Sequence, residues 1–570
     1  MLTDHADEDD RIGEAVGPLM EATVRRSPRT VRGTRSAIVA LALTVLPLAL
    51  ITAAGATLRL WSFDRVGANP FYDAAVRSMS LSWHNLFFGA LEPGGQVSVD
   101  KVPADLWLQV LSVRLFGFSG VAVRLPEALA SIVAIPLLYD LVRRGFGRTA
   151  GLAAAAALAI LPAAILTAHS DTMDSLMMLL DVAAAWLIVV GAQQRRVWPV
   201  VAAGAVMGLA FDVKLFEALI VGPALVLLVA LTVTGSARRR LLAAGAGFVA
   251  LLIVGLGWIA VASLTPLGQR PWPFGSADGS IWNMVFAYNG VDRLSGSASA
   301  AALKLDPPGV LRFFSSGGHD YLATVGTMLL AAIVLGGVAL AVAVRGRRYP
   351  AGSLAAACAV FFGTWLVTGI ALLSHMQRMQ PRYLEAVTPA IAAVVGIGIG
   401  VLARPVRRRS ALIATCGVAA VLAVPAASAL TVARQHRSDA GLPSRISPQA
   451  LDRLAAFLAA NGGRSRYEVA SSSVERAAPL IVRDGRPVLM LTSEGGRPLL
   501  SAARLATEVA GGHVRYALLA RGPCAASGGS TCAPAVRWAL RHSRDVSAAA
   551  GLAPGTLYRL GSTSPSARSG

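Results

Sequence analysis

Two carboxylates stand three residues apart in a short polar turn between two apolar runs. They are Asp171 and Asp174, and they share a face if the following helix has already begun. A carboxylate at membrane depth is costly and is by default a candidate for function, here general acid–base chemistry. Asp171 or the preceding Ser170 could instead cap the following helix.

A second set of polar residues follows the first apolar run. Residues 71–88 place apolar and aromatic side chains at helical spacing, as in a helix that lies at a membrane interface. The candidates in and after this helix are Tyr72, Asp73, His84, Asp100 and Lys101. The alternative is an aromatic interface anchor with solvated charges.

Basic residues provide a third set. Lys214 lies in a tight turn with Asp212 and Glu217, where it could bind a phosphate as a point charge or pair with either carboxylate. A later turn holds further candidates: His375, Arg378, Arg382, Tyr383 and Glu385. In membrane proteins, arginine and lysine are concentrated in the cytoplasmic loops, so arginines on the outer side need an explanation. An anionic lipid-linked substrate would explain them, and surface charge is the alternative.

These residues are set in an apolar chain. Of its 570 residues, 55% are hydrophobic and 15% are charged, and the mean hydropathy is +0.58. Soluble domains carry about 25% charged residues, so the chain has the composition of a membrane protein. The net charge is +20, but much of the arginine sits in short clusters between apolar runs, such as Arg238–Arg240. That pattern indicates membrane topology rather than a nucleic-acid-binding face.

Eleven membrane spans are predicted, so the fold class is mainly α, a polytopic transmembrane helical bundle. The ranges are 37–58, 120–142, 150–168, 173–192, 197–212, 215–234, 241–263, 322–344, 351–373, 384–403 and 410–432. Arginine clusters occupy every second connection, which predicts a cytoplasmic N-terminus. The odd number of spans then predicts an outer C-terminal region. The first run is longer than the apolar part of a signal peptide, so it is predicted to be a retained anchor.

The domain organisation follows from the same pattern. Four parts are predicted: a disordered cytoplasmic segment 1–36, a membrane domain 37–433 with long outer loops 59–119 and 264–321, a small extracellular α/β domain 434–560, and a disordered tail 561–570. The α/β prediction rests on helical patterns near 448–460, 500–510 and 533–542 and on strand-like runs at 467–471, 487–492 and 514–520.

Other motifs carry little chemistry. Cys524 and Cys532 flank a Gly/Ser-rich loop, and a disulfide is expected if this region lies outside the cell. The cysteines and histidines do not have zinc-site spacing, and the sequence requires no divalent metal, although the carboxylates could hold one. Gly396, Gly398 and Gly400 lie inside an apolar span without a preceding strand, which indicates helix packing rather than a nucleotide loop.

Several short stretches resemble a known family. They are residues 82–89, 100–103, 116–120, 174–176, 288–290, 293–296 and 381–385. Together and in this order, they resemble the dolichyl-phosphate-mannose–protein mannosyltransferase-like proteins of glycosyltransferase family 39, which have the GT-C membrane fold. More narrowly, the chain looks like the bacterial branch with an extracellular C-terminal domain.

The resemblance implies a polyprenyl-phosphate-linked sugar as donor and a transfer on the outer membrane face. An acidic residue of the family's first outer loop takes part in catalysis. The matching stretch here, Ala68-Asn69-Pro70, has no carboxylate, so Asp73 is the substitute candidate. Asp100-Lys101 matches the family's acidic–Lys–Pro motif, in which the lysine is expected to hold the donor phosphate. Asp174 matches the acidic residue of the second outer loop.

A membrane glycosyltransferase is therefore the predicted function. Cations would stabilise the leaving phosphate, for which the candidates are Lys101, Arg378, Arg382 and Lys214. A carboxylate would serve as base for the acceptor hydroxyl, for which the candidates are Asp174, Asp171 and Asp73, with Asp100 also in the catalytic group. The predicted substrate-binding residues are Tyr72, His84, His375, Tyr383 and Glu385. The acceptor could be a protein, a glycan or a lipid, and no nucleic acid is expected. A transporter or flippase of lipid-linked substrates and an inactive scaffold are the alternatives.

Overall fold

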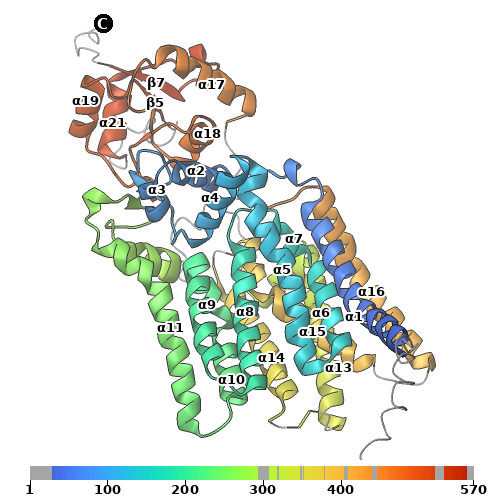
Figure 1. The fold of residues 1–570 in the computed structure, drawn as a ribbon. Helices are drawn as coiled ribbons and strands as arrows, with labels where there is room; N and C mark the ends of the chain where they lie inside the picture. Colours follow the sequence, from blue (N-terminus) through green and yellow to red (C-terminus); the bar gives the residue numbers. More distant parts are fainter. Residues whose placement is uncertain are drawn as a thin grey trace, which may run out of the picture. The chain divides into compact units, whose positions relative to one another are not determined.

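Long apolar helices make up most of the chain (Figure 1). The computed structural model describes residues 29–67, 69–292, 307–316, 320–346, 349–350, 352–377, 379–403, 408–439, 446–519 and 532–561. The chain divides into two units, Met1–Leu50 and Ile51–Gly570, and the account below concerns the second. The boundaries predicted for the four parts remain predictions.

The described residues contain eight helical segments that are long and apolar enough to cross a membrane, or nine if a bent pair is one span. The helices are α1 (Arg29–Leu60), α5 (Gly120–Phe146), α8 (Asp174–Gln194), α9 (Trp198–Lys214) with η2 (Leu215–Val221) and α10 (Gly222–Thr232), α11 (Ala237–Leu264), α13 (Thr327–Gly346), α14 (Leu354–His375) and α15 (Thr388–Leu402). The bent pair is α6 (Arg148–Ala159) and α7 (Pro162–Ala168), with 57° between them. The polytopic helical membrane fold is confirmed, but the predicted count of eleven is not.

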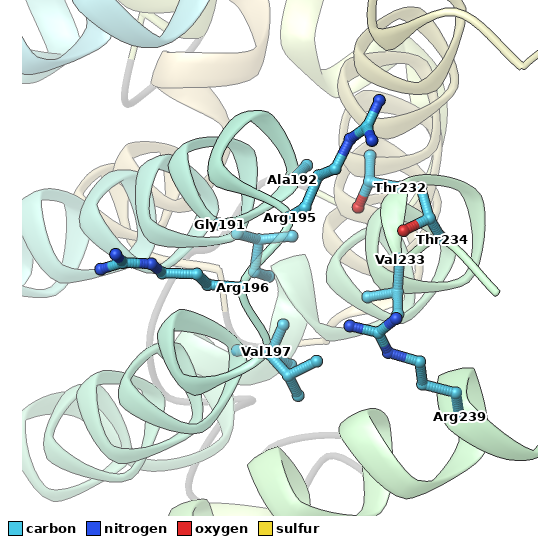
Figure 2. Close-up of a pocket in the computed structure, with 11 residues that line it drawn as sticks. Gly191, Ala192, Arg195, Arg196, Val197, Thr232, Val233, Thr234 and Arg239 are labelled. Atoms are coloured by element: carbon cyan, nitrogen blue, oxygen red, sulfur yellow. The ribbon is translucent and has the colours of Figure 1, made fainter.

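Residues 198–232 explain part of the difference between the eleven predicted spans and the eight observed segments. They count as one helical segment, whereas two spans, 197–212 and 215–234, are predicted. The two ends of this segment lie together, because Arg196 and Val233 line the same small pocket (Figure 2). The chain reverses at Leu215, whose φ is +54°. The second half then runs back beside the first.

The last predicted span, 410–432, falls on α16 (Arg408–Arg434). Within the part of α16 whose side chains are described, the apolar helix covers Leu422–Arg434, which is shorter than a full span. Its residues Ala429 and Val432 pack against α7.

The first outer loop is built from short helices. They are η1 (Phe63–Arg65), α2 (Pro70–Leu81), α3 (Trp83–Phe88) and α4 (Ala104–Phe116). The predicted single helix over 71–88 is wrong, because the chain breaks at Ser82, whose hydroxyl accepts the Asn85 N–H at 3.1 Å and begins a new helix. Trp83 and Phe87 remain exposed, as expected for anchors at a membrane interface.

A short parallel strand pair joins the two long outer loops. Strand β1 (Val97–Ser98) pairs with β2 (Trp272–Pro273). The second loop also contains η3 (Leu267–Gln269), the π-helix η4 (Asn283–Val291) and η6 (Val310–Phe314). The π-helix η7 (Leu322–Gly326) leads into α13, and η8 (Pro381–Val387) leads into α15. Strand β1 ends two residues before Asp100-Lys101, so this pairing positions a predicted site motif.

The C-terminal region contains a five-stranded mixed sheet in the order β4-β3-β5-β7-β6. The strands are β3 (Ala470–Ser471), β4 (Leu489–Met490), β5 (Tyr516–Leu518), β6 (Ser543–Asp545) and β7 (Leu557–Leu560). The helices are α17 (Pro448–Asn461), α18 (Val474–Asp484), α19 (Ala502–Ala510) and α21 (Pro534–Arg541), with short turns η9 (Glu494–Gly496) and η10 (Ala548–Ala550) (Figure 1). Each predicted strand run contains a strand and each predicted helical pattern a helix, while α18, β6 and β7 were not predicted.

Glycines let three helices pack closely. A Cβ on Gly396 would lie 2.5 Å from the Ala154 backbone nitrogen, and one on Gly398 would lie 2.8 Å from the Leu335 carbonyl oxygen. The predicted helix-packing role of these glycines is confirmed, because α15 meets α6 and α13 backbone to backbone.

Candidate functional site

Two buried carboxylates, Asp73 on α2 and Asp171 in the turn before α8, lie near one another and near Arg124 of α5. The Asn69 side-chain amide donates to Asp171 Oδ1 at 3.0 Å. The second oxygen of Asp171 and Oδ1 of Asp73 have no hydrogen-bond partner. Buried polar atoms normally have partners, so each oxygen is available to a ligand proton.

The environment of this pair favours the protonated form. Burial raises the pKa of Asp73 to about 6, and the nearby Arg124 opposes this rise. Burial, together with the charge of Asp73, raises the pKa of Asp171 well above its usual range. Burial also raises the pKa of the neighbouring Asp105 to about 6. Carboxyl groups with raised pKa values beside an arginine suit general-base chemistry near neutral pH.

The second cluster joins α2 to the Asp–Lys motif. The Lys101 ammonium donates to the Tyr72 hydroxyl at 2.8 Å and forms an ion pair with Asp100 at 3.2 Å. The Tyr72 hydroxyl donates to Asp100 Oδ1 at 3.2 Å. The Asn289 amide of η4 donates to the Asp100 carbonyl at 2.6 Å. Lys101 is therefore held in place by both long outer loops.

A third cluster holds the turn before α8. The Lys214 ammonium is 2.7 Å from Asp174 Oδ1 and donates to the Thr172 carbonyl at 2.5 Å. Both side chains of the ion pair are almost wholly buried, at 3% and 0% exposure. The partner of Lys214 is thus Asp174, and neither Asp212 nor Glu217 is its ion-pair partner.

The turn differs from the predicted capping arrangement. Helix α8 begins at Asp174, and its N-cap is Met173, with a φ of +73° and no side-chain cap. Glu127 of α5 supplies the acceptor instead, because its Oε2 accepts the Ser175 N–H at 2.8 Å. Asp171 lies before the helix, so it does not share a helical face with Asp174.

The fourth cluster lies at the start of α15. Arg382 forms an ion pair with Asp439 at 3.4 Å, and Asp439 also accepts the Arg382 backbone N–H at 2.9 Å. The Arg382 guanidinium stacks over the Tyr383 ring at 5.6 Å. Glu385 is fully buried and accepts from the Thr388 hydroxyl at 3.3 Å.

Electrostatic interactions connect the second, third and fourth clusters, and the Asp439 N–H donates to the Ser170 hydroxyl at 2.8 Å, which ties the fourth cluster to the turn that carries Asp171. Arg382 interacts with Asp174 and with Tyr72. Glu217 interacts with Lys214, Asp174, Arg382 and Lys101. The structure therefore brings together most of the predicted residues from distant parts of the sequence.

Three predicted residues do not join these contacts. His84 is on α3, and its Nε2 lies 3.0 Å from the Gln269 carbonyl oxygen. His375 is exposed at the end of α14. Arg378 lies outside the described residues.

Several charged or polar residues of the site were not predicted. They include Asp105, Gln109, Arg124, Glu127 and Asp439. The Gln109 amide donates to Asp105 at 2.5 Å and to the Asp171 carbonyl at 3.2 Å. The signal in the sequence was the presence of Arg124 and Glu127 inside an apolar span, where ionisable residues are rare.

The described residues contain no group of three or more His, Cys, Asp or Glu side chains arranged to hold a metal ion. The four clusters instead alternate carboxylates with lysine and arginine. Cys532 is disulfide-bonded, and Cys524 lies outside the described residues.

The first outer loop is also attached to the C-terminal sheet. The Gln96 side-chain amide donates to the Met490 carbonyl at 2.9 Å and accepts the Met490 N–H at 2.8 Å. Strand β4 is an edge of its sheet, so Gln96 occupies backbone positions that a further strand would use. The buried Glu92 accepts backbone N–H groups of Gly94, Gln96 and Val488, and burial raises its pKa to about 7.

Two segments of the chain match models of known protein families. Residues 100–258 match the family model described as dolichyl-phosphate-mannose-protein mannosyltransferase. Residues 454–542 match the model described as "Putative mannosyltransferase YkcB-like, C-terminal". These segments carry the Lys101, Asp174 and Lys214 clusters and most of the C-terminal sheet.

Two Bacillus subtilis proteins are similar in sequence. "Putative mannosyltransferase YkcB" is 32% identical over 255 residues, which is 44% of this chain and 35% of the relative. "Putative mannosyltransferase YycA" is 33% identical over 247 residues, or 43% of this chain and 36% of the relative. The matched stretch thus spans about a third of the length of these relatives.

Solved structures share the fold over most of the chain. ArnT from Cupriavidus metallidurans aligns with a TM-score of 0.57 and 16% identity over 92% of this chain and 98% of that one. AglB from Archaeoglobus fulgidus, solved with an inhibitory peptide and a dolichol-phosphate, aligns with a TM-score of 0.57 and 13% identity over 84% and 69%. The predicted resemblance is therefore confirmed: the chain is similar in sequence to the dolichyl-phosphate-mannose–protein mannosyltransferases, and it has the GT-C fold of ArnT and AglB.

Proposed function

We propose that this protein is a membrane glycosyltransferase that transfers a sugar from a polyprenyl-phosphate-linked donor to an acceptor on the extracytoplasmic face. The observation that carries the proposal is a pair of buried carboxylates, Asp73 and Asp171, beside two cations that are held in place. Tyr72, which precedes Asp73, binds Lys101. Ser170, which precedes Asp171, accepts the backbone N–H of Asp439, the ion-pair partner of Arg382. Transfer from a lipid phosphate needs both a base and cations, and this arrangement supplies both.

The cations would bind the donor phosphate. As the sugar–phosphate bond breaks, negative charge develops on the leaving polyprenyl phosphate, and fixed cations stabilise it. Lys101 is pre-positioned by Tyr72 and Asp100, and Arg382 by Asp439. Arg378 is retained as a third cation from the sequence. Lys214 is assigned to Asp174 and the turn rather than to the phosphate, because its ion pair is buried.

A carboxylate would take the proton of the acceptor hydroxyl. Asp171 and Asp73 are the first candidates, because they lie together beside Arg124, each has a buried oxygen without a hydrogen-bond partner, and neither forms an ion pair within the described residues. Asp174 is assigned a positioning role, since it pairs with Lys214. Tyr383 and Glu385 lie beside Arg382 and are proposed to bind substrate with Tyr72. His84 and His375 are retained as outer substrate contacts.

Two structurally similar proteins have been solved together with lipid phosphates. ArnT has been solved bound to undecaprenyl phosphate, and AglB with dolichol-phosphate. Both ligands are polyprenyl-type phosphates, which supports a lipid-phosphate donor for this chain.

We propose a bacterial cell membrane as the location, with a cytoplasmic N-terminus and an outer C-terminal domain. The arginine clusters at the connections support this orientation. It can be tested by introducing Arg453→Cys or Arg239→Cys, each at an exposed position, and labelling intact cells with an impermeant maleimide. Labelling at residue 453 alone would support the proposed orientation, and labelling at residue 239 alone would show the opposite orientation.

The function can be tested in proteoliposomes that contain the purified protein and radiolabelled polyprenyl-phosphate sugars. A transferase releases the sugar to an acceptor or to water. A flippase moves the intact donor between leaflets without releasing the label. A scaffold does neither, so the three hypotheses give different results.

A further inference from the structure

The C-terminal region contains an open cavity that the proposed transfer chemistry does not use. Its volume is about 730 Å³, within the range of about 300–1,000 Å³ that is common for ligand sites. The cavity lies at one end of the antiparallel strand pair β5–β7. At this end β5 begins and β7 ends, because Tyr516 is opposite Arg559. The C-terminal ends of α17, α19 and α21 complete its wall.

An aromatic surface lines one side of the cavity. The Trp538 and His542 rings stack with 4.6 Å between their centroids and 14° between their planes. The His542 Nδ1 lies 2.9 Å from the Trp538 carbonyl oxygen, which fixes the imidazole against the indole. Both side chains are half-buried. A flat, partly exposed aromatic face suits contact with the C–H face of a sugar ring.

Cationic side chains also line the cavity. They are Arg515, directly before β5, and Arg559 of β7, and both are exposed. No Asp or Glu is among the described lining residues, and neither arginine forms an ion pair within the described part of the chain. Asn461 adds an amide that can donate and accept. Two guanidinium groups without carboxylate partners favour an anionic ligand, because their planar forks match carboxylate and phosphate oxygens.

We propose that this cavity binds an acidic glycan, one whose sugars carry carboxylate or phosphate groups, and that this glycan is the acceptor. The second part rests on the proposed function. An acidic peptide fits less well, because β7 lies between β5 and β6 and offers no free strand edge for an added peptide strand. The stacked aromatic pair beside arginines and an amide suits a charged saccharide.

Binding can be measured by calorimetry on the full-length protein in nanodiscs. The probes are an oligogalacturonate, a phosphorylated oligomannoside, a neutral maltooligosaccharide and a polyglutamate peptide. The first two separate carboxylate from phosphate recognition. The proposal predicts that at least one acidic oligosaccharide binds, and that the neutral sugar and the peptide bind about tenfold more weakly or not at all.

The matched variants are Arg515→Ala/Arg559→Ala and, as control, Arg453→Ala on the exposed face of α17. The double variant should weaken binding of the acidic glycan about tenfold or more, and the control should leave it unchanged. Arg515→Lys/Arg559→Lys keeps the charges but removes the bidentate forks, so it should bind with intermediate affinity and report on the site if the alanine variant is unstable. Equal binding of acidic and neutral sugars, equally tight binding of polyglutamate, or unchanged binding in both double variants would overturn the proposal.

Transfer provides the second readout. In the double variant, release of sugar from the donor to water should persist, while transfer to the acidic glycan should be lost. Unchanged transfer to the glycan would refute the acceptor role. A wild type that cleaves no donor would refute the proposed function and leave the binding result standing, so the two failures are distinguishable.

Discussion

At the scale of single residues, the site is defined by which charges are paired and which are not. Asp174 and Lys214 form an almost wholly buried pair, and Asp100 and Lys101 form a slightly exposed pair. Asp73 has a carboxyl oxygen with no partner. The paired groups hold geometry, and the carboxyl oxygens without partners are the candidates for proton transfer.

The raised pKa of Asp171 predicts an acid limb in the rate of transfer. Burial, followed by the charge of Asp73, raises this pKa well above its usual range, and a base must be deprotonated to act. Below that pKa the rate should fall about tenfold per pH unit. The charge of Asp73 helps to raise the pKa of Asp171, so Asp73→Asn should move the acid limb of the remaining activity to lower pH. A pH–rate profile of both proteins measures this, and a limb that moves to higher pH would contradict it.

Breaking the buried ion pair should cost stability. Lys214→Met leaves Asp174 without its cation at 0% exposure, and such losses cost about 3–5 kcal/mol. Lys214→Met/Asp174→Leu removes both charges and should recover part of this loss. Denaturant unfolding in detergent compares the two proteins. A double variant less stable than Lys214→Met would show that the pair does not account for the effect.

Much of the site could be predicted from residue types, because ionisable side chains between or inside apolar spans are rare. Tyr72, Lys101 and Arg382 were found this way, and the structure brings them together. The ion-pair partner of Lys214 could not be predicted, because Asp174 lies forty residues away in the sequence and only the folded chain brings it close. Asp439 was not predicted because nothing in its local sequence marks it.

At the scale of elements, short segments position the site residues. Strand β1 precedes Asp100-Lys101, and Gln96, directly before β1, is bound to the backbone of the edge strand β4. The helix over 71–88 was predicted as one element because its apolar spacing is continuous. The break at Ser82 depends on a cap that competes with the continuing helix, and spacing alone does not reveal it.

Removing the Gln96 side chain should loosen the first outer loop. Gln96→Ala loses both hydrogen bonds to Met490, so Lys101 should be less well positioned and kcat should fall several-fold. Gln269→Ala, an exposed glutamine of the second outer loop, is the matched control. Transfer kinetics and limited proteolysis of the loop provide the readouts. Equal kinetics in the two variants would argue against positioning by β4.

The helix-packing glycines allow a sharp comparison. Gly396→Ala places a methyl group 2.5 Å from the Ala154 nitrogen, whereas Gly337→Ala meets nothing within 4 Å. The first should destabilise the protein by about 1–3 kcal/mol through overpacking, and the second should not. Thermal unfolding in detergent measures the difference, and equal midpoints would contradict close packing of α15 on α6.

At the scale of the whole molecule, a bundle of apolar helices carries long connecting segments that contain much of the proposed site. The membrane class and the fold could be predicted, because composition and long apolar runs leave few alternatives. The number of spans could not be predicted, because α10 is short and the 3₁₀ helix η2 supplies the rest of this segment's length.

The most direct test of the central claim is the rate of donor cleavage by the wild type, Asp171→Asn and Lys101→Ala in the same proteoliposomes. We expect the wild type to release sugar from a polyprenyl-phosphate donor. Asp171→Asn should lose about 100-fold or more in rate while still binding the donor, because a general base contributes about 10²–10⁴-fold. Lys101→Ala should lose donor affinity and rate together. A wild type that cleaves no donor, or variants that cleave as fast as the wild type, would contradict the assignment of this cluster as the site of transfer.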